Sequence, residues 1–264
     1  MSQAMGAVPA PSQPLALFVS DVHLQERMPA TTAAFLRFLT QHAPGTANLF
    51  VLGDLFEYWA GDDDLDTPLH RNVLDALRAL SDAGTALHWV AGNRDFLVGQ
   101  EFAHAAGMTR LPDGSVVRLG TQSIVLAHGD AQCTDDVAYM KFRHEVRSPE
   151  WQQTFLAMPL SQRKAIIDNL RLQSRDAQRG KSADIMDVNP AAIEALFEAS
   201  GCALMVHGHT HRPATHVTRD RTGQLRTRYV LPDWDVDAAP QRGGWLTLCG
   251  DGRMHSYGID GAPS

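Results

Sequence analysis

Short apolar runs alternate with amphipathic stretches along the first half of the chain. Runs that favour strands cover residues 15–19, 48–52, 86–91 and 123–127, and a helical spacing of apolar positions covers residues 31–42 and 68–83. Such alternation of strands and helices is typical of a buried, largely parallel sheet. We therefore expect an α/β fold.

From about residue 135 to residue 199 the pattern indicates helices alone. Helical segments are expected at 137–146, 161–177 and 190–199, and strands return at 203–206, 215–218, 226–231, 244–248 and 253–257. The sequence thus predicts one domain over residues 15–264, a two-sheet sandwich flanked by helices (αββα) with a helical cap inserted at about 135–199. Residues 1–14 lack basic residues and an apolar core, so we expect a flexible tail rather than a signal peptide.

Composition narrows the class of protein. The 264 residues are 44% hydrophobic, enough for a large buried core, and the net charge of −7 argues against nucleic-acid binding, which needs clustered Lys and Arg. The three cysteines form no CxxC pair, so we expect neither a disulfide framework nor a thiolate zinc site. The sequence contains no run of eighteen apolar residues, and we expect a cytoplasmic protein.

Five short polar clusters each follow an expected strand. They are Ser20-Asp21-Val22-His23, Gly53-Asp54, Gly92-Asn93-Arg94-Asp95, Ala127-His128-Gly129-Asp130 and Gly208-His209-Thr210-His211. Open α/β sheets place their sites at the carboxyl ends of strands, so we expect these clusters to meet. The candidate metal ligands are Asp21, His23, Asp54, Asn93, His128, His209 and His211.

The ligand types predict a pair of divalent ions. A mixed nitrogen and oxygen set without thiolates suits Mn²⁺, Fe²⁺ or Zn²⁺ better than Ca²⁺ or Mg²⁺, and Mn²⁺ is our first choice. Two such ions can activate water against a phosphoryl group, which points to hydrolysis of a phosphate ester or anhydride. A single Gly-Asp after a strand is usually a turn, but five clusters in this order make that interpretation improbable. The role of His207 stays open between structural and supporting.

The order of the clusters resembles the calcineurin-like metallophosphoesterase superfamily over roughly residues 15–213. The resemblance implies that the seven candidates are metal ligands, with Asp54 bridging the ions, and that Asp54, Asn93, Arg94 and His128 are catalytic. Many members carry His where this chain has Arg94. A guanidinium can hold a phosphate but cannot act as a general acid, so the site suits a leaving group that needs no proton, such as a phosphate monoester.

Longer strings are similar to the UDP-2,3-diacylglucosamine hydrolase family of lipid A biosynthesis over nearly the whole chain. They include residues 53–59, 92–97, 128–136, 185–189 and 207–213. The resemblance implies attack of water on the α-phosphate of a nucleotide-sugar lipid, releasing UMP and 2,3-diacylglucosamine 1-phosphate. It also implies substrate contacts at Asn93, Arg94, Asp136, Ser174, Lys181 and His209, and at Gln178, where the family often has Asn. Asp130 either orients His128 or serves a turn.

The predicted insertion is basic and rich in apolar residues. Between Lys141 and Lys181 there are nine Lys or Arg and four Asp or Glu. Interspersed apolar residues are Met140, Phe142, Trp151, Phe155, Leu156, Ile166, Ile167 and Leu170. An apolar inside could hold two acyl chains and a basic outside could rest on anionic lipid, so we expect a peripheral protein on the cytoplasmic face of the inner membrane. Alternatively, these residues simply pack the insertion on the sandwich.

Two other functions compete with this hypothesis. The chain could be a phosphoesterase of the same fold that acts on a soluble dinucleotide, a cyclic nucleotide or a phosphoprotein. It could also be a non-catalytic metal-binding module, although such proteins usually lose ligands and none is missing here. The sequence does not identify any protein partner.

Overall fold

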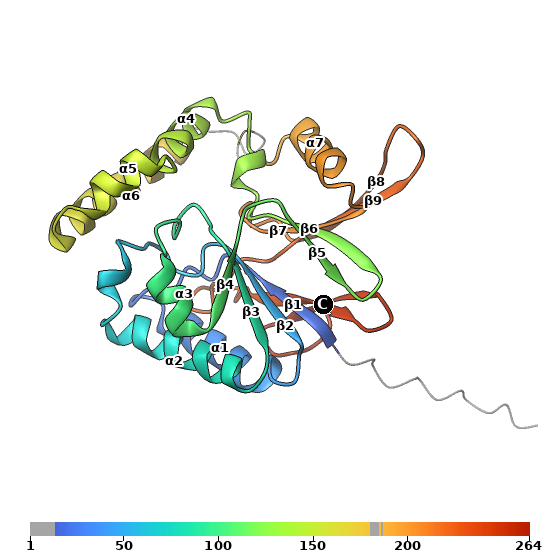
Figure 1. The fold of residues 1–264 in the computed structure, drawn as a ribbon, viewed down its shortest axis with the longest axis horizontal. Helices are drawn as coiled ribbons and strands as arrows, with labels where there is room; N and C mark the ends of the chain where they lie inside the picture. Colours follow the sequence, from blue (N-terminus) through green and yellow to red (C-terminus); the bar gives the residue numbers. More distant parts are fainter. Residues whose placement is uncertain (1–13, 180–184, 186) are drawn as a thin grey trace, which may run out of the picture.

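Two sheets face each other in the centre of the molecule (Figure 1). The computed structural model describes residues 14–179, 185 and 187–264, with 173–179 described as helical backbone only. The first sheet has the order β11-β10-β1-β2-β3-β4, and its strands are β1 (Pro14–Val19), β2 (Asn48–Leu52), β3 (Ala86–Val90), β4 (Met108–Leu111), β10 (Gly244–Cys249) and β11 (Met254–Gly258). Strands β1 to β4 are parallel, whereas β10 and β11 are antiparallel to their neighbours.

The second sheet has the order β5-β6-β7-β9-β8. Its strands are β5 (Ser115–Leu119), β6 (Gln122–Leu126), β7 (Leu204–His207), β8 (Ala214–Arg219) and β9 (Leu225–Val230). Strands β6, β7 and β9 run parallel, so both sheets place several strand ends at the same edge of the sandwich.

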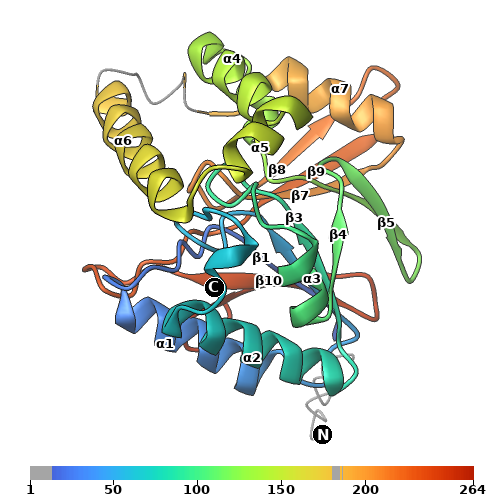
Figure 2. The same ribbon diagram turned by 60° about the vertical axis from the view of Figure 1, so that its left-hand side comes forward.

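Helices cover both outer faces of the sandwich. On the first sheet lie α1 (Pro29–Arg37), which continues into a short π-helix (Phe38–His42), α2 (Pro68–Asp82) and α3 (Gln100–Ala106), and α7 (Pro190–Ser200) packs on the second sheet. Helices α4 (Val137–Val146), α5 (Pro149–Leu156) and α6 (Leu160–Arg179) stand to one side, above the strand ends (Figure 2). The predicted αββα sandwich is confirmed. The extent of the insertion at about 135–199 stays a prediction.

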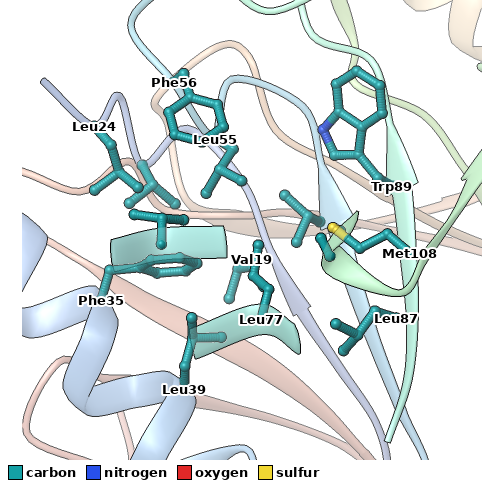
Figure 3. Packing of buried hydrophobic residues seen from close by; sticks show 14 of the residues in the cluster. Val19, Leu24, Phe35, Leu39, Leu55, Phe56, Leu77, Leu87, Trp89 and Met108 are labelled. Atoms are coloured by element: carbon teal, nitrogen blue, oxygen red, sulfur yellow. The ribbon is translucent and has the colours of Figure 1, made fainter. Parts of the chain in front are cut away.

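Strand alternation explains the layers. On β1, Leu17 and Val19 face the helices, where they join the cluster in Figure 3, whereas Ala16 and Phe18 face the second sheet. All four side chains are buried. A sandwich with both faces covered therefore needs the continuous apolar runs seen in the sequence.

Helix starts follow a repeated cap. Thr67, Ser148 and Asn189 each accept a hydrogen bond from the first helical turn, and a proline follows each of them at the first helical position. Among the described residues, no helix is both long enough and apolar enough to span a membrane. The three cysteines are buried, and none of them forms a disulfide in the described part of the chain.

Candidate metal centre and substrate cavity

The seven candidate ligands come together at the strand ends between the two sheets. Asp21 and His23 follow β1, Asp54 follows β2 and Asn93 follows β3, while His128 follows β6 and His209 and His211 follow β7. Each sheet therefore contributes part of the set.

The ligands divide into two groups on either side of Asp54. In one group, the Nε2 atoms of His23 and His211 are 3.2 Å apart, and Asp21 Oδ1 is 3.4 Å from His211 Nε2. In the other, Asn93 Oδ1 is 3.0 Å from His128 Nε2 and 2.8 Å from His209 Nδ1.

Asp54 faces both groups at once. Its Oδ2 is 3.9 Å from His23 Nε2, and its Oδ1 is 3.6 Å from His128 Nε2. Asp21 also approaches the second group, because ligand atoms of Asp21, Asp54 and His128 lie within 4.8 Å of one another. The arrangement expected of a carboxylate that bridges two ions is therefore present at Asp54.

The residues fit two divalent cations. Asp21 Oδ1 is buried and has no hydrogen-bond partner among the described residues, a costly state that a bound cation would relieve. Burial raises the pKa of Asp21, but the close contact with the His211 imidazole and the charges of His128 and His23 hold that pKa well below the usual range. Burial lowers the pKa of His128, but Asp54, Asp21 and Asp130 raise it to about 9. The raised pKa of His128 reflects the negative charge of these three carboxylates, and a cation site requires such negative charge.

The backbone at the ligands is unusual. Among the described residues, the non-glycine residues with positive φ are Asp21, His23, Asp54, His209 and His211, with values between 52° and 67°. All five are candidate ligands, and the left-handed region costs a non-glycine residue about 1–2 kcal/mol. The fold therefore holds these side chains in place at the expense of local strain.

Close packing of the loops requires glycine beside the ligands. A Cβ atom at Gly92 would lie 2.0 Å from Asp54 Oδ1, and one at Gly208 would lie 2.1 Å from Asp21 Oδ2. Asp95 fixes the same loops, because its carboxylate accepts hydrogen bonds from the backbone N–H groups of Leu55 (2.8 Å) and Gly92 (2.9 Å).

Further side chains support the histidines. His23 Nδ1 is 2.9 Å from Glu57 Oε2, and Glu57 Oε1 accepts a hydrogen bond of 2.6 Å from Arg171 on α6. The ring of His128 is instead oriented by a main-chain group, since its Nδ1 donates to the carbonyl of Leu52 at 2.8 Å. Such outer contacts set the ring orientation and the tautomer that faces a metal.

Asp130 links the centre to the cap rather than to the His128 ring. Its Oδ2 accepts hydrogen bonds from Tyr139 Oη (2.7 Å) and Arg143 Nε (2.8 Å), and it forms an ion pair with Arg147. Arg147 in turn donates to the carbonyl of Gly92 at 2.8 Å. Neither of the two roles considered for Asp130 describes this network.

The family is now decided by comparison. The family model described as calcineurin-like phosphoesterase matches residues 15–213. The chain belongs to this family. A protein named UDP-2,3-diacylglucosamine hydrolase from Aromatoleum aromaticum is 50% identical over 223 residues, covering 84% of this phosphoesterase and 90% of that protein. Proteins of the same name from Chromohalobacter salexigens (50% over 219 residues; 83% and 88% covered) and Ralstonia nicotianae (46% over 241 residues; 88% of each) are also similar.

A cavity of about 540 Å³ opens between the candidate metal centre of the phosphoesterase and its cap. Its polar side carries His23, Asp54, Asn93, Arg94, Asp136, His209 and His211. Its apolar side includes Phe96, Phe142, Val146, Trp151, Phe155, Ile167, Leu170 and Ile185. The cavity thus joins a cation site to an apolar chamber.

The apolar residues of the insertion divide between the cavity, the core and the surface. Phe142 and Leu170 line the cavity, whereas Phe155, which also lines it, packs in the main core with 3% exposure. Leu156 and Ile166 are exposed.

The basic residues of the cap of the phosphoesterase turn inward more than we expected. Cap cations that pair with acids of the sandwich are Arg143 and Arg147 with Asp130, Arg163 with Asp63, Lys164 with Asp64, and Arg171 with Glu57. Much of the local excess of positive charge is therefore used to attach the cap, and these five residues do not form a basic outer face.

The predicted substrate contacts divide into three sets. Asn93, Arg94, Asp136 and His209 line the cavity, and Asp136 also caps α4 through Tyr139 N. Ser174 and Gln178 belong to α6, but their side chains are not described. Lys181 lies outside the described residues. Glu57, Arg171 and Tyr139 also line the cavity and were missed by the sequence analysis.

Proposed function

We propose that this phosphoesterase hydrolyses UDP-2,3-diacylglucosamine to UMP and 2,3-diacylglucosamine 1-phosphate with two divalent ions, Mn²⁺ being our first choice. The observation that carries the proposal is one cavity that has the candidate ligands on one side and an apolar lining from α4, α5 and α6 on the other. Relatives of that name at 45–50% identity support the choice of substrate.

The bond changes are those of a pyrophosphate hydrolysis. An oxygen of water forms a bond to the α-phosphorus, the bond from that phosphorus to the bridging oxygen breaks, and the electron pair leaves with the β-phosphate. When bound, two divalent ions supply Lewis-acid activation of the water and of the phosphoryl oxygens. The seven residues that would hold them are Asp21, His23, Asp54, Asn93, His128, His209 and His211.

Arg94 suits this leaving group. Its main-chain N–H donates to Asp54 Oδ1 at 2.8 Å, which fixes the residue beside the centre, and its side chain lines the cavity. A guanidinium stabilises the negative charge of a phosphate but supplies no proton. The departing monoester needs none, because its second pKa is about 6.

The apolar wall receives the acyl chains in this proposal. Phe142, Ile167 and Leu170 line the chamber. Asp136 also lines it, and we expect its carboxylate to accept hydrogen bonds from the glucosamine hydroxyl groups. Ser174, Gln178 and Lys181 are expected to complete the contacts to the head group.

We also propose that the protein is peripheral on the cytoplasmic face of the inner membrane. Large apolar side chains are exposed around the cap, among them Val137 (75%), Phe142 (38%) and Leu172 (60%). Exposed apolar groups beside an acyl-binding chamber would contact the lipid surface from which the substrate is extracted.

Three measurements test the function. Purified protein with Mn²⁺ should turn over UDP-2,3-diacylglucosamine, and a UDP-sugar without acyl chains should be a far poorer substrate. Equal turnover of both would exclude the lipid substrate and favour a phosphoesterase for soluble nucleotides. Reaction in ¹⁸O-labelled water should place the label in UMP; label in the lipid product would refute attack at the α-phosphate.

Asp54→Ala should abolish turnover while the circular dichroism spectrum stays close to that of the parent. Retained activity with saturating metal would refute the two-metal mechanism and reopen the other functions considered above.

A further inference from the structure

A second, smaller cavity adjoins the candidate metal centre. It measures about 220 Å³ and is lined by Asp187, Thr210, Arg212, Pro213, Ala214, His216, Arg228 and Val230. Thr210 and Arg212 also line the large cavity, so the two cavities meet at the loop that carries His209 and His211. In Figure 1, the β8–β9 hairpin lies at the upper right and helices α4, α5 and α6 lie at the upper left.

Three basic side chains line this second cavity. They are Arg212, Arg228 and His216, and the lining contains one carboxylate, Asp187, which forms an ion pair of 2.7 Å with Arg212. His216 and Arg228 are direct partners across the β8–β9 ladder, so both reach the same opening. The side chains of Arg212, Arg228 and His216 offer hydrogen-bond donors to carbonyl and hydroxyl oxygens.

Arg228 is held in place by a histidine whose role the sequence left open. Arg228 Nη1 is 2.9 Å from His207 Nε2, and His207 Nδ1 is 2.9 Å from the carbonyl of Gly208. Because Nδ1 faces a carbonyl oxygen, it carries the proton, and Nε2 accepts the hydrogen bond from Arg228. His207 is 1% exposed, so this contact gives the guanidinium a fixed orientation.

Thr210 adds an unused donor. Its Oγ1 is buried and has no hydrogen-bond partner among the described residues, and it lies between the two cavities. A buried hydroxyl group without a partner is rare in folded proteins and often marks a position that a ligand or water completes.

We propose that this second cavity binds the nucleoside half of the substrate, with Arg228 and His216 donating to the ribose or uracil oxygens of UMP. The inference rests on the proposed function, because a substrate cut at its α-phosphate has an apolar half and a nucleoside half on either side of the metal centre. The large cavity provides an apolar chamber for the first half. The second cavity offers the hydrogen-bonding side chains of Arg228 and His216 to the other half. The string at 185–189, whose Asp187 lines this cavity, thereby gains a role.

Binding of UMP to the full-length, Mn²⁺-loaded protein tests the site by titration calorimetry, and inorganic phosphate serves as a second ligand. Arg228→Gln should weaken UMP binding about 10-fold, the value of a hydrogen bond to a charged group. His216→Ala, at an exposed position, should weaken it about 3-fold. Arg219→Gln lies on the same strand and bonds to the turn at Gly223, so it should change UMP affinity by less than about 2-fold.

Phosphate separates contact with the nucleoside from an indirect effect. Arg228→Gln should leave the affinity for inorganic phosphate within about 2-fold of the parent, because phosphate alone occupies the metal centre. An equal loss of UMP and phosphate affinity would mean that Arg228 acts through the metal-ligand loop and would overturn the proposal. Unchanged UMP affinity in both Arg228→Gln and His216→Ala would also overturn it.

The assay does not depend on turnover. If UMP binding depends on Arg228 but the acylated substrate is not hydrolysed, the nucleoside site stands and the proposed function fails. If the substrate is hydrolysed and neither Arg228→Gln nor His216→Ala changes the UMP affinity, the function stands and the nucleoside site is refuted.

Discussion

Glu57 connects a candidate metal ligand with the cap, and Glu57→Gln should weaken metal binding. The carboxylate is 9% exposed and divides its two oxygens between His23 Nδ1 (2.9 Å) and Arg171 Nη2 (2.6 Å). Burial raises its pKa, but His23, Arg94 and Arg171 lower it to about 2, so Glu57 is charged at neutral pH. The neutral amide keeps the shape and one acceptor but loses the charge.

The size of the effect follows from these contacts. Removing a carboxylate that orients a metal-binding histidine typically costs 10- to 100-fold in metal affinity. Arg171 already neutralises part of the charge of Glu57, so the lower end applies: about 10-fold, or about 1.4 kcal/mol. In metal-free protein the same substitution removes one short, charge-assisted hydrogen bond and should lower the free energy of unfolding by about 1.5–3 kcal/mol.

Competition with a chelator of known affinity measures the metal dissociation constant directly, and urea unfolding in EDTA measures the metal-free stability. Glu101→Gln is a matched control, because Glu101 is exposed on α3 and away from the centre. A metal affinity within about 2-fold of the parent in Glu57→Gln would refute the orienting role. A loss of similar size in Glu101→Gln would show that the assay reports net charge.

Three further outcomes follow from the structure. Gly92→Ala should lower the free energy of unfolding by about 2–3 kcal/mol and prevent metal binding, because the added Cβ would collide with Asp54. The control is Gly84→Ala, which has open space around the added Cβ but a φ of 102°. In a urea titration it should lower the free energy of unfolding by only about 1 kcal/mol. Arg163→Met should cost about 2–3 kcal/mol because it removes the buried bond to the Ala60 carbonyl, while exposed Arg78→Met stays within about 0.5 kcal/mol. Chelation should lower the melting temperature reversibly, since metal at 100 times its dissociation constant contributes about 2.7 kcal/mol. Equal free energies of unfolding in a variant and its control, or a melting temperature that EDTA does not change, would contradict these estimates.

The candidate site could be predicted because its ligands are local in sequence. Each cluster places its polar residues directly after an apolar run. Because the carboxyl ends of parallel strands lie at one edge of a sheet, these residues can be predicted to meet even when the tertiary contacts are not known. The supporting residues could not be found this way. Glu57, which contacts His23, is paired with Arg171, which lies 114 positions away, and nothing in either local sequence indicates the pairing.

Fold prediction failed for short elements and for the partners of charges. The sequence analysis missed β4, β5, α3 and α5, which have between four and eight residues and too few buried positions to establish a period. The basic count in the cap was correct, but a count does not reveal that Arg163 and Lys164 meet acids near residue 63. A charge run therefore predicted an outer face where the structure has an attachment.

The order of the strands has a consequence for biosynthesis. Strand β1 lies between β2 and β10, and Pro14 at its start pairs with Cys249. The pairing of β1 with β10 therefore cannot form while residues 244–249 are still inside the ribosome. Asp21 and His23 directly follow β1, so their place in the sheet is completed only after this pairing. Until β10 has left the ribosome, the nascent chain must leave one edge of the apolar strand β1 unpaired, so we expect its folding yield to depend more strongly on chaperones than on the strength of its metal site.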